Sequence, residues 1–169
     1  DAPVVHLTRM QSAAGAITFV PATNPTGALA LACAFETTDS REHVVRLGVA
    51  DALPREGVTI VRTTASGLWI NLRQIRRHRR FLIVGLPQTP DRATPGGTLT
   101  VTTYGSGRLD LPMKAETTLG AKALLTGYVV EGRLVLRAEN DPYSGTLQQV
   151  CDVYGYSETS WRDPFTPLS

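Results

Sequence analysis

The stretch that decides the fold runs from Leu124 to Tyr156 and reads LLTGYVVEGRLVLRAENDPYSGTLQQVCDVYGY. Its first part holds two apolar runs rich in β-branched residues, Leu124 to Val130 and Leu134 to Ala138. Between them, Glu131-Gly132 fits a tight turn. Two such runs joined by a short turn predict a β-hairpin.

The hydrophobic pattern changes in the second part of this stretch. Apolar and aromatic residues recur there at helical spacing: Leu147, Val150, Cys151 and Tyr154. Thr146 and Gln149 form a capping-box pattern at the start of this run, and Gly155 is a typical helix stop. The pattern predicts one short amphipathic helix between Thr146 and Gly155.

Composition favours a globular protein. Hydrophobic residues make up 42% of the 169 residues and charged residues 19%. The formal net charge of +2 is too small to imply a polyanion partner for the whole molecule. Cys33 and Cys151 lie in apolar patterns, so we expect reduced core residues. Because no membrane-spanning run and no signal-peptide pattern is present, we expect a cytoplasmic protein, with a mature secreted protein as the alternative.

Most of the remaining chain carries strand patterns separated by turns. Ala28 to Phe35 is apolar throughout, as in a central strand, and Thr98 to Tyr104 alternates cleanly. About ten short strands predict a mainly-β single domain over residues 1–169, a two-sheet β-sandwich with one short C-terminal helix. In the tail, residues 157–169, Trp161 and Phe165 predict docking on the body.

Three segments carry a resemblance to a known family. They are Ile70-Asn71-Leu72 followed by a strand beginning at Phe81, the hairpin over residues 125–138, and the helix between Tyr143-Ser144-Gly145 and Tyr154-Gly155. In order and spacing, residues 68–156 resemble the TerD/TerA tellurium-resistance family, of which the chain would be a divergent member. The resemblance implies a bacterial, non-catalytic stress-response or scaffold module with a protein partner.

The same resemblance implies calcium, but the first half of the chain departs from the family pattern. The strand Ala28 to Phe35 contains no carboxylate, and no acid lies in Thr64 to Gly67. Calcium takes six to eight oxygens, usually from several converging carboxylates. The remaining candidate acids are scattered over turns: Glu36, Asp39, Asp51 and Glu56. We therefore expect solvated turn residues, no calcium and no other cofactor.

A basic cluster precedes the strand that begins at Phe81. It contains five arginines and a histidine in eight positions: Arg73, Arg76, Arg77, His78, Arg79 and Arg80. Guanidinium groups bind phosphate and carboxylate in bidentate geometry, so the cluster indicates an anion-binding site. No aromatic residues interleave with the arginines, which disfavours nucleic acid. The alternative is a solvated loop whose arginines pair with the acid-rich segment after Glu139.

Catalytic motifs are missing from the sequence. None of the three histidines has metal-ligand spacing, and no nucleophile motif such as G-x-S-x-G occurs. The sequence thus leans away from an enzyme. A small ligand-binding or hydrolytic sandwich remains an alternative, with its site under the longest loop, Pro87 to Gly97. The oligomeric state is left open.

Overall fold

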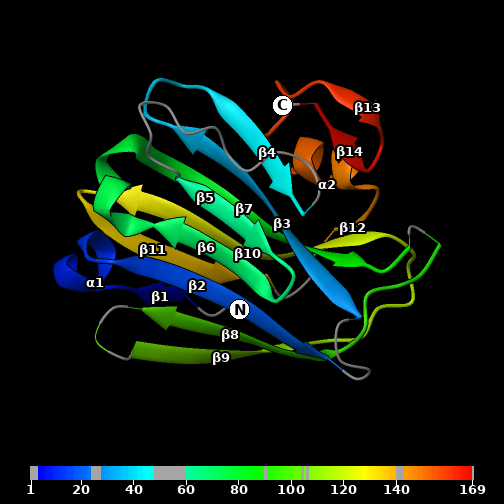
Figure 1. The fold of residues 1–169 in the computed structure, drawn as a ribbon, viewed down its shortest axis with the longest axis horizontal. Helices are drawn as coiled ribbons and strands as arrows, with labels where there is room; N and C mark the ends of the chain where they lie inside the picture. Colours follow the sequence, from blue (N-terminus) through cyan, green and yellow to red (C-terminus); the bar gives the residue numbers. More distant parts are fainter. Residues whose placement is uncertain are drawn as a thin grey trace.

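The architecture is a two-layer β-sandwich with helices at one end and on one outer face (Figure 1). The computed structural model describes residues 4–23, 28–47, 60–89, 91–103, 105, 107–139 and 143–168. Two of the calcium candidates, Asp51 and Glu56, lie outside these residues. The mainly-β sandwich expected from the strand patterns is confirmed.

The first sheet is antiparallel throughout. Its path is β1 (Val4–His6), β11 (Arg133–Ala138), β10 (Ala121–Val130), β7 (His78–Pro87), β3 (Leu29–Thr37) and β4 (Glu42–Arg46). The short β12 (Ser144–Gly145) pairs with β10 on the side away from β7. As the apolar run predicted, β3 is a central strand, because it pairs with β4 on one side and β7 on the other.

The second sheet is also antiparallel and lies against the first, with its strands running in roughly the same direction (Figure 1). Its order is β5 (Val61–Thr64), β6 (Gly67–Asn71), β2 (Ala16–Thr23), β8 (Gly97–Thr103) and β9 (Gly107–Met113). Residues 98–103 of the alternating run thus lie in β8, which is paired on both sides, and the edge position belongs to β9.

The core between the sheets is organised by one row of residues across the first sheet. Phe35, Phe81, Gly127 and Leu136 are successive cross-strand partners on β3, β7, β10 and β11. The side chains of Phe35, Phe81 and Leu136 are buried in the core cluster. Phe19, from the opposite sheet, meets Phe81 edge-on with ring centroids 6.0 Å apart. The row therefore joins the two layers through aromatic contacts.

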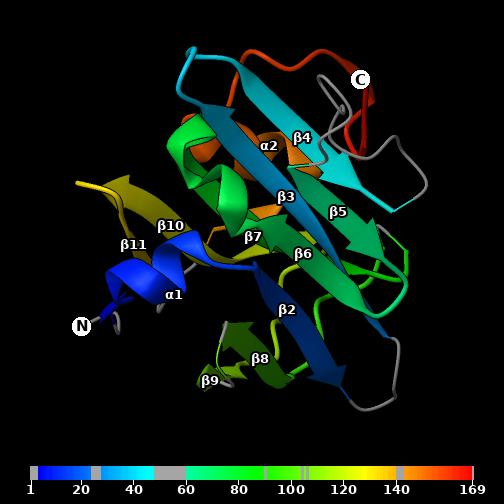
Figure 2. The same ribbon diagram turned by 60° about the vertical axis from the view of Figure 1, so that its left-hand side comes forward.

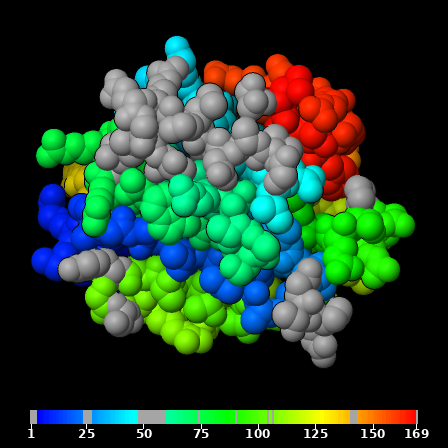
Figure 3. All heavy atoms as spheres, in the orientation of Figure 1, coloured from blue at the N-terminus to red at the C-terminus, as the bar shows by residue number. Residues whose placement is uncertain are grey.

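The outer face of the first sheet carries a second apolar cluster. It is covered by α2 (Leu147–Val153) and by the hairpin of β13 (Trp161–Asp163) with β14 (Thr166–Pro167). Trp161 and Phe165, the two residues of the tail that the sequence singled out, pack against this cluster. Figure 3 shows the C-terminal residues, in red, packed against the body.

The hairpin and helix predicted from the deciding stretch are confirmed. β10 and β11 pair through the turn Glu131-Gly132, whose φ values of 52° and 75° both lie in the left-handed region. The Thr146 hydroxyl accepts a hydrogen bond from the backbone N–H of Gln149, completing the capping box. Gly155 follows the helix with φ of 84°, as its role as a stop requires.

The expectation of a single helix was wrong. A second helix, α1 (Arg9–Ala13), follows β1, and a 3-10 helix, η1 (Leu72–Arg77), precedes β7. The two lie in contact at one end of the sandwich (Figure 2). Thr8 and Gln11 form a capping box like that of α2, which is the local signal for α1 that the strand interpretation missed. β7 also begins at His78 rather than at Phe81.

Candidate functional site

The basic cluster begins on η1, at the end of the sandwich. The Asn71 side chain caps this helix by accepting a hydrogen bond from the Arg73 backbone N–H at 3.0 Å. A 3-10 helix has three residues per turn, so Arg73 and Arg76 project from the same side. Both side chains are exposed, and neither has an ion pair with another residue in the described part of the chain.

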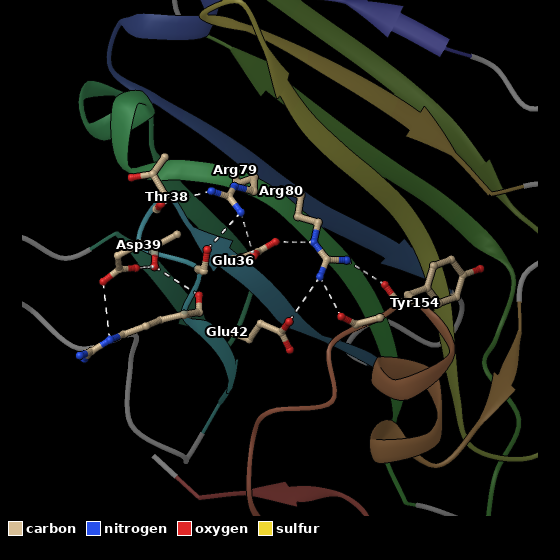
Figure 4. A network of polar contacts seen from close by, with 11 residues as sticks. Glu36, Thr38, Asp39, Glu42, Arg79, Arg80 and Tyr154 are labelled. Carbon is tan, nitrogen blue, oxygen red and sulfur yellow. Dashed lines mark hydrogen bonds and ion pairs between the residues drawn. The ribbon is translucent and has the colours of Figure 1, made fainter.

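Arg79 and Arg80, at the end of the cluster, instead form ion pairs and hydrogen bonds within the protein (Figure 4). Arg79 lies 3.3 Å from Glu36 and donates to the Thr38 carbonyl at 3.2 Å. Arg80 lies 2.8 Å from the second oxygen of Glu36 and 3.5 Å from Glu42. These two arginines are thus paired within the protein, with acidic partners from β3 and β4 and not with the acid-rich segment after Glu139.

His78 lies inside the protein rather than on the anion-binding surface on which the sequence placed it. Its ring is 3% exposed, and Nε2 lies 3.2 Å from the Asn71 carbonyl. Burial lowers the pKa of His78 to about 4. The imidazole is therefore neutral at physiological pH and adds no positive charge to the arginines.

This burial makes part of the stability depend on pH. The unfolded chain binds a proton on His78 near pH 6.5, whereas the folded protein does so only near pH 4. The contribution of His78 to the free energy of unfolding is therefore complete above pH 6.5, and it is lost as the pH falls toward 4. Between pH 7.5 and 5.5 we expect His78 to account for a loss of about 1 kcal/mol in the free energy of unfolding. Urea titrations of His78→Gln, with exposed His6→Gln as control, measure this component; an unchanged pH slope in His78→Gln would refute it.

Three of the five arginines line two hollows. One, of about 340 Å³, lies between η1 and the β10–β11 hairpin; we call it the arginine groove, and it is lined by Thr38, Ile75, Arg76, His78, Arg79, Val129 and Gly132. The other, of about 160 Å³, contains Arg77 together with Asp39 and His43. Of the predicted anion-binding residues, only Arg76 and Arg79 bring a cationic group to the arginine groove. The lining of this groove also includes the apolar Ile75 and Val129.

The described acids do not fit a calcium site. Both carboxylate oxygens of Glu36 are taken by Arg79 and Arg80. Asp39 accepts a hydrogen bond from the Thr37 hydroxyl, which is the main reason why its pKa lies below the usual value, and it pairs with Arg41 at 3.7 Å. Within the residues that the structure describes, no three His, Cys, Asp or Glu side chains converge as metal ligands. The absence of calcium stays a prediction.

The two thiols are buried, as the sequence predicted. Cys33 and Cys151 are free and have no exposed surface. Burial raises the pKa of both groups. A thiolate is the nucleophilic form of cysteine, so these side chains are held in their unreactive form.

A larger cavity, of about 400 Å³, opens at the other end of the sandwich. It is near the loop Pro87 to Gly97, but the described residues of that loop do not line it. They pack behind its wall instead: the Thr94 carbonyl accepts from Glu116 N–H at 3.0 Å, and the Arg92 carbonyl accepts from Gly120 N–H at 2.9 Å.

Sequence reasoning missed the charged pair in this cavity, Lys122 and Glu116, whose Nζ and Oε1 atoms lie 3.0 Å apart. The one local signal was a lysine inside the apolar strand pattern AKALL, because lysine is almost never fully buried without a partner.

We compared the chain with models of protein families, with curated protein sequences and with solved structures, and none matches. None of the helices among the described residues is both long and apolar enough to span a membrane.

Proposed function

We propose that the chain is a non-catalytic, TerD-like scaffold module that holds an acidic protein segment in the arginine groove. As the family resemblance implies, the module would serve a cytoplasmic response to tellurite and related chemical stress in bacteria. The observation that carries this proposal is the composition of the groove, in which Arg76 and Arg79 border the apolar Ile75 and Val129. Such a surface suits a peptide that combines carboxylates with apolar side chains.

Two further observations support the proposal. The segments on which the resemblance rests form regular elements, β6 with η1, β7, the β10–β11 hairpin and α2, with β8 and β9 between β7 and the hairpin and β12 before α2. In addition, both thiols and His78 are buried, so these groups, which often serve as nucleophiles or bases, are enclosed in the protein. Both observations favour binding over catalysis.

The test uses Arg73→Glu with Arg76→Glu, since these two exposed side chains have no structural ion pair to lose. We expect the wild-type protein to bind a fluorescent Glu- and Leu-containing peptide, with affinity falling as salt is raised. The double variant should bind at least tenfold more weakly, because each change replaces an attraction with a repulsion. In cells lacking the protein, the wild type should restore growth on tellurite and the variant should not.

The matched control is Arg137→Glu with Arg162→Glu, which makes the same change in net charge at exposed positions on β11 and β13. Equal loss of peptide binding in the control would mean that net charge alone is responsible, and the groove would be rejected. Stronger binding of single-stranded RNA than of the peptide would replace the protein partner by a nucleic acid. Normal tellurite tolerance without the protein would refute the stress-response role.

A further inference from the structure

The cavity of about 400 Å³, at the end of the sandwich opposite the arginine groove, is a second candidate ligand-binding site. Its walls come from both sheets, with Leu99, Leu111 and Met113 on one side and Ala123, Leu124 and Ala138 on the other. At about 400 Å³ it is within the range of small-molecule sites, which are mostly apolar with a few fixed polar groups. This cavity is distinct from the arginine groove, with which it shares no lining residue.

Local strand geometry explains why the cavity is not filled. The pairing of β10 with β7 shifts register between Ala123 and Leu125, so the strand is irregular at the cavity wall. On the neighbouring strand, Ala138 lies opposite Leu125 and presents only a methyl group. Residues 114–116 then leave β9 and border the opening. The space is thus built by small side chains and a bulge in ordered strands.

Among the polar groups that line the cavity, the ammonium of Lys122 is buried, because the side chain of this residue is only 5% exposed. Its Nζ donates to the Lys114 carbonyl at 2.6 Å and pairs with Glu116 at 3.0 Å. A lysine ammonium has three N–H donors, so these two contacts leave one donor. Among the described residues no other acceptor takes it, and Lys122 lines the cavity. A ligand oxygen could therefore accept this hydrogen bond.

Charge and size restrict the ligand further. Two cations, Lys114 and Lys122, face two anions, Glu116 and Glu139, so the formal charges of the lining cancel (2 − 2 = 0). An added carboxylate would leave the lining and ligand with a net charge of −1, and it would find Lys122 already paired with Glu116. If each non-hydrogen atom occupies about 30 Å³, the cavity holds roughly a dozen of them.

From these features we infer that the cavity binds a neutral, mostly apolar small molecule whose single oxygen accepts a hydrogen bond from Lys122. Medium-chain aliphatic alcohols and ketones belong to this class. The apolar part would replace water against Leu111, Met113 and Leu124, which is the main source of affinity. The oxygen of the ligand would accept the remaining hydrogen bond from Lys122 and so fix the orientation of the ligand.

The test is an NMR titration of the ¹⁵N-labelled full chain with 1-octanol, with sodium octanoate and octane as matched probes. We expect saturable shifts at Leu111, Met113 and Leu124, with octanol binding more tightly than octanoate. Lys122→Met keeps the length of the side chain but removes the donor, so octanol affinity should fall roughly tenfold while octane binding should not fall.

Two variants fill the cavity from opposite walls, Leu111→Trp on β9 and Ala138→Leu on β11. Either should abolish the saturable shifts, whereas Leu109→Trp, on β9 but outside the lining, should retain them. Dispersed spectra identify variants that still fold. Saturable shifts that persist in a folded Ala138→Leu variant would overturn the location. Tighter binding of octanoate, or no localised shift with octanol up to its solubility limit, would overturn the ligand class.

Discussion

Replacing Phe81 with alanine is expected to lower the free energy of unfolding by about 3–5 kcal/mol, the range for a large aromatic side chain in a packed core. Phe81 is 2% exposed and contacts Phe19 across the two sheets. Its removal would leave a cavity bordered by β3 and β10, because those strands hold its cross-strand partners Phe35 and Gly127. Urea unfolding followed by fluorescence measures the effect.

Gly127 provides the sharper form of this test. A Cβ placed on Gly127 would overlap three atoms of the Phe81 ring, so the ring occupies the space that any other side chain would need. We expect Gly127→Ala to cost about 1–3 kcal/mol through overpacking. Adding Phe81→Leu should recover part of this loss, since the shorter side chain leaves room for the methyl group. Strictly additive effects in the double variant would show that the two residues are not coupled.

Replacing Arg80 with methionine is expected to cost about 2–4 kcal/mol. The Arg80 side chain is 22% exposed and pairs with Glu36 and Glu42, which are only 12% and 10% exposed. It also donates to the carbonyls of Tyr154 and Gly155 at 3.0 and 2.7 Å. Methionine keeps most of the packing volume but leaves the nearly buried Glu42 without its cation and Glu36 with Arg79 alone, and it frees the end of α2.

The guanidinium of Arg80 also lies over the ring of Tyr156, just after α2, and its central carbon is 4.1 Å from the centroid of that ring. Hydrogen exchange should therefore show faster opening of α2 in Arg80→Met than in the wild type. Arg76→Met is the control, because that exposed arginine has no ion pair within the described residues. If the two variants unfold at the same urea concentration, Arg80 does not hold α2 on the sheet.

The deciding stretch determined its own structure because its signals are local. Two apolar runs rich in β-branched residues marked the strands β10 and β11, and Glu131-Gly132 supplied the left-handed turn between them. Thr146 and Gln149 set the start of α2 through contacts three residues apart. The capping box at Thr8 was equally local, but it opens a helix of only five residues, which is too short to show a hydrophobic period.

These local sequence signals could not predict the order of the strands in the two sheets. A period-two pattern shows which residues share a face, but it does not say which strand lies beside which. Only the sheet places Glu36 next to Arg80 and brings Glu42 beside Glu36, and this placement decides which arginines of the basic cluster are engaged. The same limit hid the burial of His78, because a residue at the junction of η1 and β7 has no neighbours in sequence that reveal its packing.

The sequence by itself therefore determined the secondary elements of the second half, the sandwich class and the buried state of both cysteines, because periodicity, capping and apolar runs act over a few residues. Only the tertiary structure decided that Arg79 and Arg80 are structural, that Arg76 faces a groove, and that Lys122 lies in a cavity with Glu116. Those outcomes depend on contacts between strands far apart in the chain, whose pairing is set by the packing of the whole sandwich.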